Sequence, residues 1–519
     1  MNQTQVRLPF RREFLFALAI LGLTMIARFF MIGAFDLGND EAHYYMYAAH
    51  PALSYFDHPL MVALLIRIGT AIGGVTSFGV RFFAPLLFLL SSIVLSMIAL
   101  FLSPRPGVLL RTVILLNAIP LFGYLGSMLM LPDSSLSLFW LLYVLVSLIL
   151  FTRMKKLSPG ARTQGWILLG ALFGLSLLSK YNGILLAPAT FLILLFTRSL
   201  RPLLKSPAPY LALGLGFLVA TPLFLWNIRN NGVSFRFQAS HGLGGSIHLN
   251  WVPLYQMIFG QMGYISPILF GLLLWIIWKN RGIETADRGL ARSHSLRLLA
   301  WFSAIPVLFF NGIGILHPIL PHWPSMGYLT AIPLLALFWE EHGQTRISSW
   351  IRYGVAFGAV LSLLVTLQLF FRPLVLPSKM PLWIDITNDL FGFRELSRNV
   401  QKELDRHRDR ITTPFFFAAQ HFNTADELAF YLGHPYHTIC LDQRFTQFDF
   451  WNDPHRFLGK NGLFVSTDKY PVDPSVYYPK GTFDRILPLP PLTVYRRGLP
   501  ARIFHVYWLV GFRHVPWRD

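Results

Sequence analysis

The sequence has little cysteine and few acidic side chains. Cys440 is the only cysteine among 519 residues, which excludes an intrachain disulfide and a cysteine-based zinc site. Only 13% of the residues are charged, whereas a soluble globular protein has about a quarter. Common enzyme motifs are also missing, because no P-loop, GxGxxG, HExxH or DxD occurs. The letters DEAH at 40–43 lack the Walker-type GK[ST] that a helicase needs, so we treat them as chance.

The chain contains long apolar runs and few charged residues. The chain is 54% hydrophobic, and runs such as FLFALAILGLTMIARFFMIGAF reach the length that crosses a bilayer. We predict a polytopic α-helical membrane protein. The first run has a basic start but is too long for a signal peptide and lacks a cleavage site, so we interpret it as an uncleaved anchor. The eleven expected spans are about 14–35, 80–102, 107–124, 134–152, 164–179, 182–197, 208–226, 256–278, 296–311, 325–340 and 350–371.

Lysine and arginine are concentrated in alternate loops. One side carries most of them, and the positive-inside rule places that side, with the N-terminus, in the cytoplasm. The net charge of +19 therefore indicates membrane topology rather than a nucleic-acid partner. With an odd number of spans, everything after residue 372 lies outside, which is the periplasm if the source is a Gram-negative bacterium. The few outer-side cations of the membrane part are Arg67, Arg81, Lys180, Arg229 and Arg236.

The tail from 372 to 519 differs in character from the rest. It is polar and combines an amphipathic helical pattern, FRELSRNVQKELDRH, with strand-like runs such as TPFFFAAQ, HTICLD and NGLFVST. We predict a transmembrane domain over 1–371, with its active site in the first outer loop at 36–79. A small extracytoplasmic α/β domain is expected over 372–519.

The acids of the membrane part gather on one side. Ten acids lie in residues 1–371, and five of them fall at the predicted outer face. An acid at the membrane boundary is costly, so this gathering indicates a site there. Helix capping or simple solvation is the alternative for each, and we favour a structural role for Asp36 and Glu41. The five outer acids are Asp36, Asp40, Glu41, Asp57 and Asp133.

Outer-side cations near apolar runs predict phosphate binding. Lys180 stands in LLSKYNGILL, while Arg229 and Arg236 flank NNGVSF ahead of His241. Cations at that depth need anionic partners, and a lipid phosphate is a natural one. The alternatives are pairing with the outer acids and snorkelling to the interface.

The segment around the first outer loop also carries apolar and aromatic residues. LMVALLIRIGTAIGG, after Pro59, is interrupted by Arg67 and predicts an amphipathic helix in the membrane interface. Tyrosines and histidines in this loop can stack on a sugar and bond its hydroxyl groups. For Tyr45 and Tyr47 we favour an interfacial aromatic belt instead.

Eight motifs, in this order and spacing, resemble the GT-C glycosyltransferases of the protein O-mannosyltransferase and aminoarabinose (lipid A) transferase superfamily. The resemblance covers nearly the whole chain and implies the GT-C fold with 11–13 transmembrane helices. The bacterial members use polyprenyl-phosphate-linked sugars. The motifs are DEAHYY (40–45), YFDHP (55–59), MLPDSSLSLFW (130–140), LLSKYNGILLAP (177–188), TPLFLWN (221–227), SFRFQASHGL (234–243), PHWP (321–324) and RFTQFDFW (444–451).

The resemblance implies roles for individual residues. Asp40, with Glu41 beside it, matches the acid that takes the proton from the acceptor hydroxyl, and Asp133 matches the second acid. Histidine stands where the family has fixed cations, and with a reference pKa near 6.5 it can be neutral at pH 7. Phosphate binding then relies on the lysine and arginines or depends on pH. The residues predicted to bind the donor phosphate or sugar are His43, Tyr44, Tyr55, Asp57, His58, Lys180, Arg229, Arg236 and His241.

The expected reaction is a one-step displacement that inverts the anomeric carbon of an undecaprenyl-phosphate sugar at the outer face of the bacterial inner membrane. The acceptor is a hydroxyl or phosphate of a glycolipid, polysaccharide or protein. No cofactor is expected, and a metal bridging Asp57, His58 and His241 is disfavoured because their spacing matches no known ligand pattern. The alternatives are a transporter or flippase, for which Arg28 within the first span argues, and a non-catalytic subunit of polysaccharide assembly.

Overall fold

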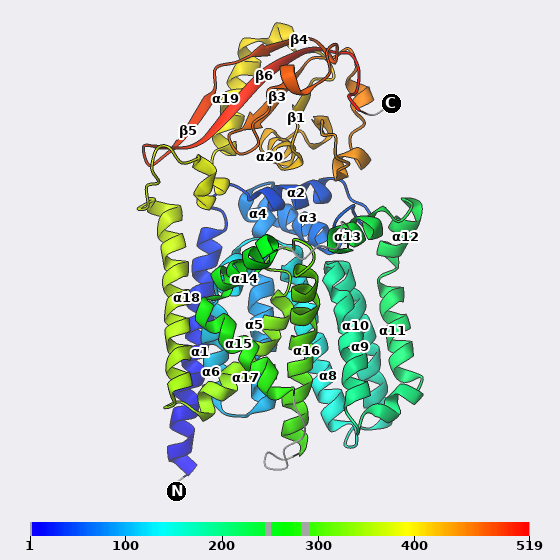
Figure 1. Cartoon of the computed structure of the whole chain (residues 1–519), viewed down its shortest axis with the longest axis vertical. Helices are drawn as coiled ribbons and strands as arrows, with labels where there is room; N and C mark the ends of the chain where they lie inside the picture. The colour runs from blue at the N-terminus through cyan, green and yellow to red at the C-terminus, as the bar shows by residue number, and fades with distance from the viewer. Residues whose placement is uncertain (1–2, 244–250, 282–289, 518–519) are drawn as a thin grey trace. The chain divides into compact units, whose positions relative to one another are not determined.

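The computed structural model describes residues 3–243, 251–281 and 290–517, without the side chains of 3–11, 241–243, 251, 290, 291 and 410. Contacts divide the chain into two compact units (Figure 1). The first unit comprises Met1–Phe30, Asp57–Val62 and Phe83–Leu363, and the second Met31–Phe56, Ala63–Phe82 and Leu364–Asp519. Most of the first outer loop is thus grouped with the C-terminal segment, whereas the sequence placed it with the membrane helices.

The first unit is a bundle of apolar helices. Its core joins side chains from most of these helices, including the fully buried Trp140, Phe302 and Tyr328. Its main helices are α1 (Gln3–Met31), α5 (Phe83–Leu102), α6 (Pro106–Ala118), η1 (Leu121–Leu125), α7 (Gly126–Met128), α8 (Pro132–Arg153), α9 (Pro159–Ser179), η2 (Tyr181–Leu185), α10 (Leu186–Phe196), η3 (Arg201–Lys205), α11 (Ala208–Val219), α12 (Thr221–Arg229), α13 (Val233–Leu243), α14 (Trp251–Ile265), α15 (Pro267–Asn280), α16 (Leu290–Gly314), α17 (Ser325–Glu341) and most of α18 (Arg346–Phe371).

The multi-pass membrane character is confirmed, but the count of eleven spans is not. Among the described residues, six helices are long and apolar enough to cross a membrane, and counting three bent pairs raises the number to nine. The pairs α6 with η1–α7, α11 with α12, and α14 with α15 bend by 79°, 56° and 100°. The expected spans 182–197 and 325–340 fall on shorter helices. α17 has 17 residues, which at about 1.5 Å per residue is shorter than a hydrocarbon core of about 30 Å.

Arg28 stabilises the break between α6 and η1. Its Nε donates to Ser127 Oγ at 2.7 Å, and its Nη2 donates to Asn117 Oδ1 at 2.8 Å and to the Gly123 carbonyl at 2.7 Å. The guanidinium also lies 4.3 Å from the centre of the Phe88 ring. A helix break frees backbone carbonyls, and a buried arginine that satisfies one of them has a structural reason to be there. Arg28 is therefore no longer an argument for a transporter.

Small residues allow α9 and α11 to pack closely. A Cβ added at Gly174 would lie 2.5 Å from the carbonyl oxygen of Gly216, closer than atoms can approach. Glycine at these positions lets the two backbones touch, as is usual for helix pairs in membranes. The same pair of helices forms one wall of a pocket described below.

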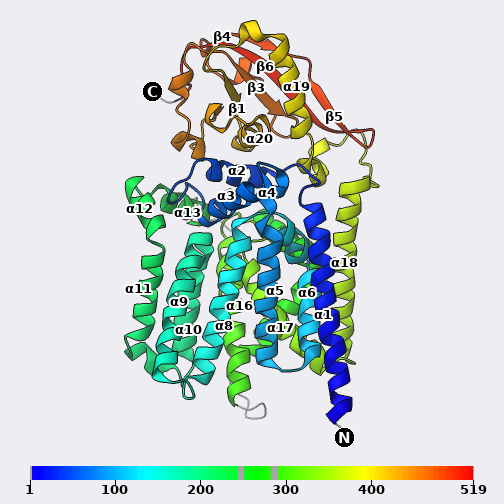
Figure 2. The same ribbon diagram turned by 180° about the vertical axis from the view of Figure 1, so that it is seen from behind.

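The second unit contains a mixed sheet with strand order β2-β1-β3-β6-β4, and β5 also pairs with β6 (Figure 2). The first three strands of that order run parallel, and the others are antiparallel to their neighbours. The predicted C-terminal α/β domain and its three strand-like runs are confirmed. Its strands are β1 (Phe416–Ala419), β2 (Thr438–Cys440), β3 (Gly462–Thr467), β4 (Phe483–Pro488), β5 (Leu492–Arg496) and β6 (Leu499–Phe512).

Helices and aromatic side chains surround this sheet. α20 connects β1 to β2, as a parallel pair requires. Phe416, Phe464 and Phe512 are fully buried in the sheet's core. The segment FRELSRNVQKELDRH, which has the amphipathic pattern, forms α19. The helices grouped with the sheet are α2 (Asn39–Ala49), most of α3 (Met61–Gly73), α4 (Ser77–Arg81), α19 (Phe393–Arg406), α20 (Phe422–Leu432) and α21 (Pro474–Tyr477), with short turns η5 (Leu382–Ile384), η6 (Ile386–Leu390), η7 (Arg408–Arg410), η8 (Pro435–His437), η9 (Gln447–Phe450) and η10 (Pro454–Phe457).

A buried ion pair holds the start of α2. Arg81 Nη2 lies 2.6 Å from Glu41 Oε2, and the two side chains are 2% and 1% exposed. Arg81 also donates to the carbonyls of Ile32 and Asp36, at 2.9 and 2.8 Å. Glu41 Oε2 accepts the Gly38 N–H at 2.9 Å. One pair therefore fixes both the chain that enters α2 and the first turn of the helix.

Glu41→Gln should destabilise the fold, because it leaves the Arg81 guanidinium buried without its counter-charge. Breaking such a pair from one side costs about 3–5 kcal/mol. Thermal unfolding in detergent should show a clear drop in Tm, whereas the exposed Glu395→Gln should leave it unchanged. Wild-type stability combined with lost turnover in Glu41→Gln would instead assign Glu41 a chemical role.

Candidate active site

A buried ion pair in the first unit joins two of the predicted site residues. Asp133 lies in the first turn of α8, and Lys180 caps the C-terminal end of α9. Lys180 Nζ is 2.6 Å from Asp133 Oδ2, and the side chains are 8% and 19% exposed. The other carboxylate oxygen, Oδ1, is buried and has no hydrogen-bond partner among the described residues. The pair therefore presents an ammonium and an unsatisfied carboxylate oxygen side by side.

His58 belongs to the surroundings of this pair. Burial lowers the pKa of His58, and the nearby Lys180 charge lowers it further, against the opposing effects of Asp57 and Asp133. His58 Nδ1 lies 3.8 Å from Asp57 Oδ2. Gln238 of α13 donates from Nε2 to the Asp57 carbonyl at 2.8 Å, which ties the YFDHP turn to the SFRFQASHGL motif. At pH 7 His58 is a neutral imidazole and does not replace a fixed cation.

His322, in the turn before α17, is a member of the cluster that we did not select from the sequence. Burial lowers its pKa to about 4, with the Lys180 charge acting in the same direction and Asp133 opposing it. His58 also acts on it electrostatically, so the residues of this cluster influence one another. His322 lies in PHWP, one of the motifs that carry the resemblance. A single histidine between apolar segments, however, has no spacing pattern that would assign it a partner.

The two predicted phosphate-binding arginines lie on helices that follow one another in the chain. Arg229 ends α12 and Arg236 lies in the second turn of α13, and both side chains are exposed. Their roles remain predictions. His241 lies in the last turn of α13, but its side chain is outside the described residues. The metal hypothesis that includes His241 is therefore untested, and no group of three or more metal-ligating residues occurs in the described part of the chain.

In the second unit, α2 presents one predicted catalytic acid to solvent. Asp40, in the first turn of α2, is exposed, whereas its neighbour Glu41 is buried against Arg81. The positive end of the helix dipole favours the ionised form of an acid in this first turn. Asp40 is thus accessible to solvent, and Glu41 is used to hold the helix.

His43 is buried between two polar partners of the same unit. Its Nδ1 is 2.8 Å from Asp426 Oδ2, and its Nε2 is 3.0 Å from the Tyr47 hydroxyl. A carboxylate at Nδ1 keeps the proton there, so that Nε2 accepts from the tyrosine. With 5% exposure and both ring nitrogens engaged, His43 serves the packing of α2 on α20, and the arrangement gives no support to a phosphate contact.

The tyrosines of this segment are also buried. Tyr55 donates to the Tyr47 carbonyl at 2.8 Å, and the two rings stack 4.1 Å apart. Tyr45 packs edge-on against Phe430 of α20 at 4.7 Å. Tyr44 is 7% exposed. The expected aromatic belt at Tyr45 and Tyr47 is wrong, because these rings fill space between α2, α20 and the YFDHP turn.

We did not select the acids of α20 from the sequence, because they lie far from the first outer loop along the chain. Glu427 is fully buried, and neither carboxylate oxygen has a hydrogen-bond partner among the described residues. Burial raises the pKa of Glu427 well above its usual range, and the nearby Asp36, Glu41 and Asp426 raise it further against Arg502. Burial therefore favours the protonated, neutral form of this carboxyl group. Asp36 lies 3.2 Å from Arg394 Nε, which supports the structural role favoured for it.

Comparison with known proteins agrees with this geometry. Residues 57–226 match the model of the family described as dolichyl-phosphate-mannose-protein mannosyltransferase. That stretch contains Asp57, His58, Asp133 and Lys180. The chain is 24% identical over 371 residues to the lipid A galacturonosyltransferase RgtD of Rhizobium johnstonii, which is 70% of this chain and 72% of the relative.

The fold is that of ArnT from Cupriavidus metallidurans. Structures of ArnT in the apo state and bound to undecaprenyl phosphate each match with a TM-score of 0.58. The match covers 94% of this chain and 97% of ArnT, at 16% and 17% identity. Together, the family match, the relative and this fold show that the chain is similar to glycosyltransferases and support an enzyme of that class.

Proposed function

We propose that the chain transfers a sugar from undecaprenyl phosphate to a hydroxyl or phosphate group of an acceptor at the outer face of the bacterial inner membrane. The N-terminus is cytoplasmic and the sheet-containing unit periplasmic in this proposal, as the loop charges indicate. The acceptor class that the relative supports is a lipid A-type glycolipid, since RgtD is named a lipid A galacturonosyltransferase.

The observation that carries the proposal is the Lys180–Asp133 pair. An ammonium group has three donors, so Lys180 can hold Asp133 and a phosphate oxygen at the same time. Asp133 lowers the cost of keeping the lysine charged inside a helical bundle. His58 and His322 are neutral at pH 7, so Lys180 supplies the fixed positive charge of the cluster. A lipid phosphate is the anion available at the end of such a bundle, and ArnT is known in complex with one.

The reaction requires the protein mainly to position the two substrates and to stabilise the charge that develops on the leaving phosphate. The acceptor oxygen attacks the anomeric carbon, the bond from that carbon to the phosphate oxygen breaks, and the configuration inverts. The electron pair of the broken bond stays on the undecaprenyl phosphate, where Lys180 offsets the developing charge. Asp133 Oδ1, which has no hydrogen-bond partner among the residues that the structure describes, can accept a hydrogen bond from a sugar hydroxyl.

Asp40 is the proposed general base. It takes the proton of the acceptor hydroxyl as the new bond forms, and its exposure on α2 allows an acceptor to approach. General-base assistance typically contributes about a hundredfold to ten-thousandfold to a rate. Glu41, buried beside Arg81, and His43, buried beside Asp426, hold the helix that carries this base.

Asp40→Asn should lower turnover by about a hundredfold or more, because the amide cannot take the proton. Purified protein in detergent would be supplied with radiolabelled undecaprenyl-phosphate sugars and a lipid extract as acceptor. Release of undecaprenyl phosphate and formation of labelled product would be measured, with the exposed Asp405→Asn as the matched control. Wild-type turnover in Asp40→Asn would remove Asp40 from the base role and direct attention to Asp133.

Lys180→Met should weaken the binding of undecaprenyl phosphate, because it removes the charge that the phosphate needs. A contact between an ammonium and a phosphate contributes about 1.5–3 kcal/mol, so the Kd should rise about tenfold to a hundredfold. Binding would be measured by isothermal titration in detergent, with Lys402→Met on the surface of α19 as control. Unchanged affinity in Lys180→Met would refute its role as the phosphate ligand.

The lowered pKa of His322 should make the fold sensitive to acid. Because the folded pKa of about 4 lies below the unfolded value near 6.5, the unfolded chain binds more protons between these values. The stability is therefore present above pH 6.5 and is lost as the pH falls toward 4, by about 1–3 kcal/mol. His322→Gln should lose less stability than wild type between pH 7 and 4.5 in thermal unfolding, whereas the exposed His514→Gln should behave like wild type. An identical pH profile for wild type and His322→Gln would contradict the assignment.

A further inference from the structure

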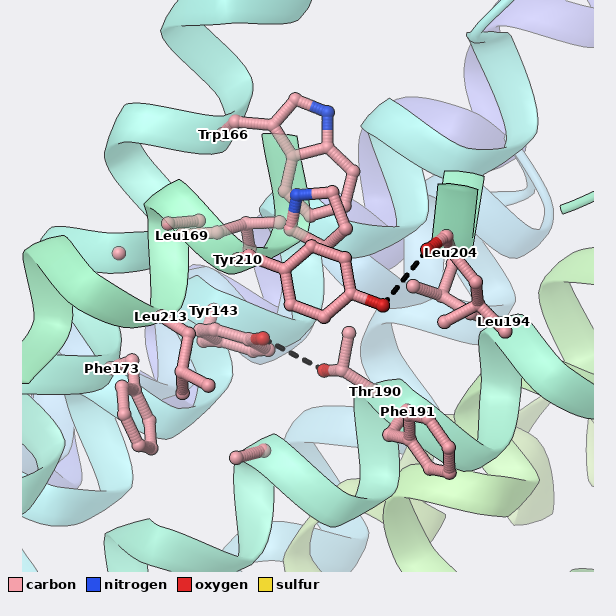
Figure 3. A pocket seen from close by; sticks show the side chains of 14 residues that line it. Tyr143, Trp166, Leu169, Phe173, Thr190, Phe191, Leu194, Leu204, Tyr210 and Leu213 are labelled. Carbon is pink, nitrogen blue, oxygen red and sulfur yellow. Dashed lines mark hydrogen bonds between the residues drawn. The ribbon is translucent and has the colours of Figure 1, made fainter. Parts of the chain in front are cut away.

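A pocket lies in the helical bundle away from the Asp133–Lys180 pair. It has a volume of about 90 Å³ and lies between α8, α9, α10, η3 and α11 (Figure 3). Tyr143 on α8 is ten residues beyond Asp133, and Trp166 on α9 is fourteen residues before Lys180. At about 1.5 Å per residue, the pocket is roughly 15–20 Å along the helices from that pair.

The lining of the pocket favours a hydrocarbon chain. Its walls are mostly leucine, phenylalanine and alanine, and the hydroxyl groups of Tyr143, Thr190 and Tyr210 are already bonded to protein. The Tyr143 hydroxyl shares a hydrogen bond of 2.7 Å with Thr190, and the Tyr210 hydroxyl donates to the Leu204 carbonyl at 2.8 Å (Figure 3). An occupant therefore has few polar partners to gain here, whereas apolar surface is favourable to bury.

The pocket is open on the side of the bundle that faces lipid. Phe191, Tyr210 and Leu213 line it and remain 49%, 56% and 36% exposed. Their exposed faces belong to apolar helices of a membrane protein, so a bilayer lipid can enter laterally without crossing water. Trp166, which is buried in the pocket wall, completes an aromatic lining of the kind that contacts acyl chains near the head-group level.

Cations lie close in sequence to residues that line the pocket. Lys205 directly follows the pocket residue Leu204, and Arg198 lies four residues beyond Leu194, and both cations are exposed. Arg162 lies four residues before Trp166 on α9, which places both on one face of that helix. From residue 134 to residue 283 the sequence contains no Asp or Glu. The nearest acid before these cations in the sequence is therefore Asp133, at the opposite end of α8 from Arg153.

We infer that this pocket binds an acyl chain of an anionic phospholipid, whose phosphate head group lies against Arg198 and Lys205. The apolar lining selects the chain, and the exposed cations select the charge of the head group. Basic residues next to a membrane attract anionic lipids. The site is separate from the one proposed for undecaprenyl phosphate, and the inference does not depend on the transferase mechanism.

Native mass spectrometry of the detergent-purified full chain would test the inference, with dioleoyl phosphatidylglycerol and dioleoyl phosphatidylcholine as probes. Wild type should bind phosphatidylglycerol about tenfold more tightly than phosphatidylcholine. Ala187→Phe, which places a ring in the pocket, should weaken the binding of phosphatidylglycerol about tenfold. Ala359→Phe, on the exposed face of α18, adds the same ring elsewhere and should have no effect.

The charge variant Arg198→Gln/Lys205→Gln changes only exposed side chains and should fold normally. It should bind phosphatidylglycerol no better than phosphatidylcholine. Lys180→Met should retain the preference, which separates this site from the donor site. Equal binding of the two lipids by wild type would mean that the pocket takes any chain and would overturn the inference. A preference that persists in the charge variant, or binding that is unchanged in a folded Ala187→Phe, would also overturn it.

Discussion

The cost of burying a charge determines how this chain is built. Lys180, Arg81 and Arg28 are all nearly excluded from solvent, and each is held by a specific set of polar partners. In each case the partners come from segments that are distant in sequence, so that pairing a charge also fixes the position of a helix end. Lys180 joins the end of α9 to the start of α8, Arg81 holds the entry to α2, and Arg28 stabilises the break after α6.

These three arrangements differ in what they leave unsatisfied. The Arg28 and Arg81 guanidinium groups donate to carbonyls as well as to side chains, which suits a structural role. The Lys180–Asp133 pair leaves a buried carboxylate oxygen without a hydrogen-bond partner in the described part of the chain. An unsatisfied buried oxygen is costly, and a substrate hydroxyl that satisfies it gains binding energy for the same reason. The pair is therefore the best candidate for chemistry among the buried charges.

The helices that carry this pair also form the lipid pocket at a distance from it. α8 and α9 contribute Asp133 and Lys180 at one end and Tyr143 and Trp166 further along. The close approach of α9 and α11 at Gly174 and Gly216 restricts how far these helices can shift independently. Occupation of the pocket and the alignment of the ion pair therefore depend on the same helix packing.

Composition and periodicity determined the membrane class, the helical segments and the polar tail, because apolar runs and strand-like alternation are local properties of a sequence. The motifs indicated the family and selected Asp133 and Lys180. Only the tertiary structure decided which polar residues are used for packing, as with Glu41 beside Arg81 and His43 beside Asp426, since these partners are 40 and 383 positions apart. It also revealed the roles of His322 and Glu427 as buried titratable groups, and it showed that three of the expected spans are bent. The physical reason is that burial and charge pairing depend on distances in space, which no spacing in the sequence contains.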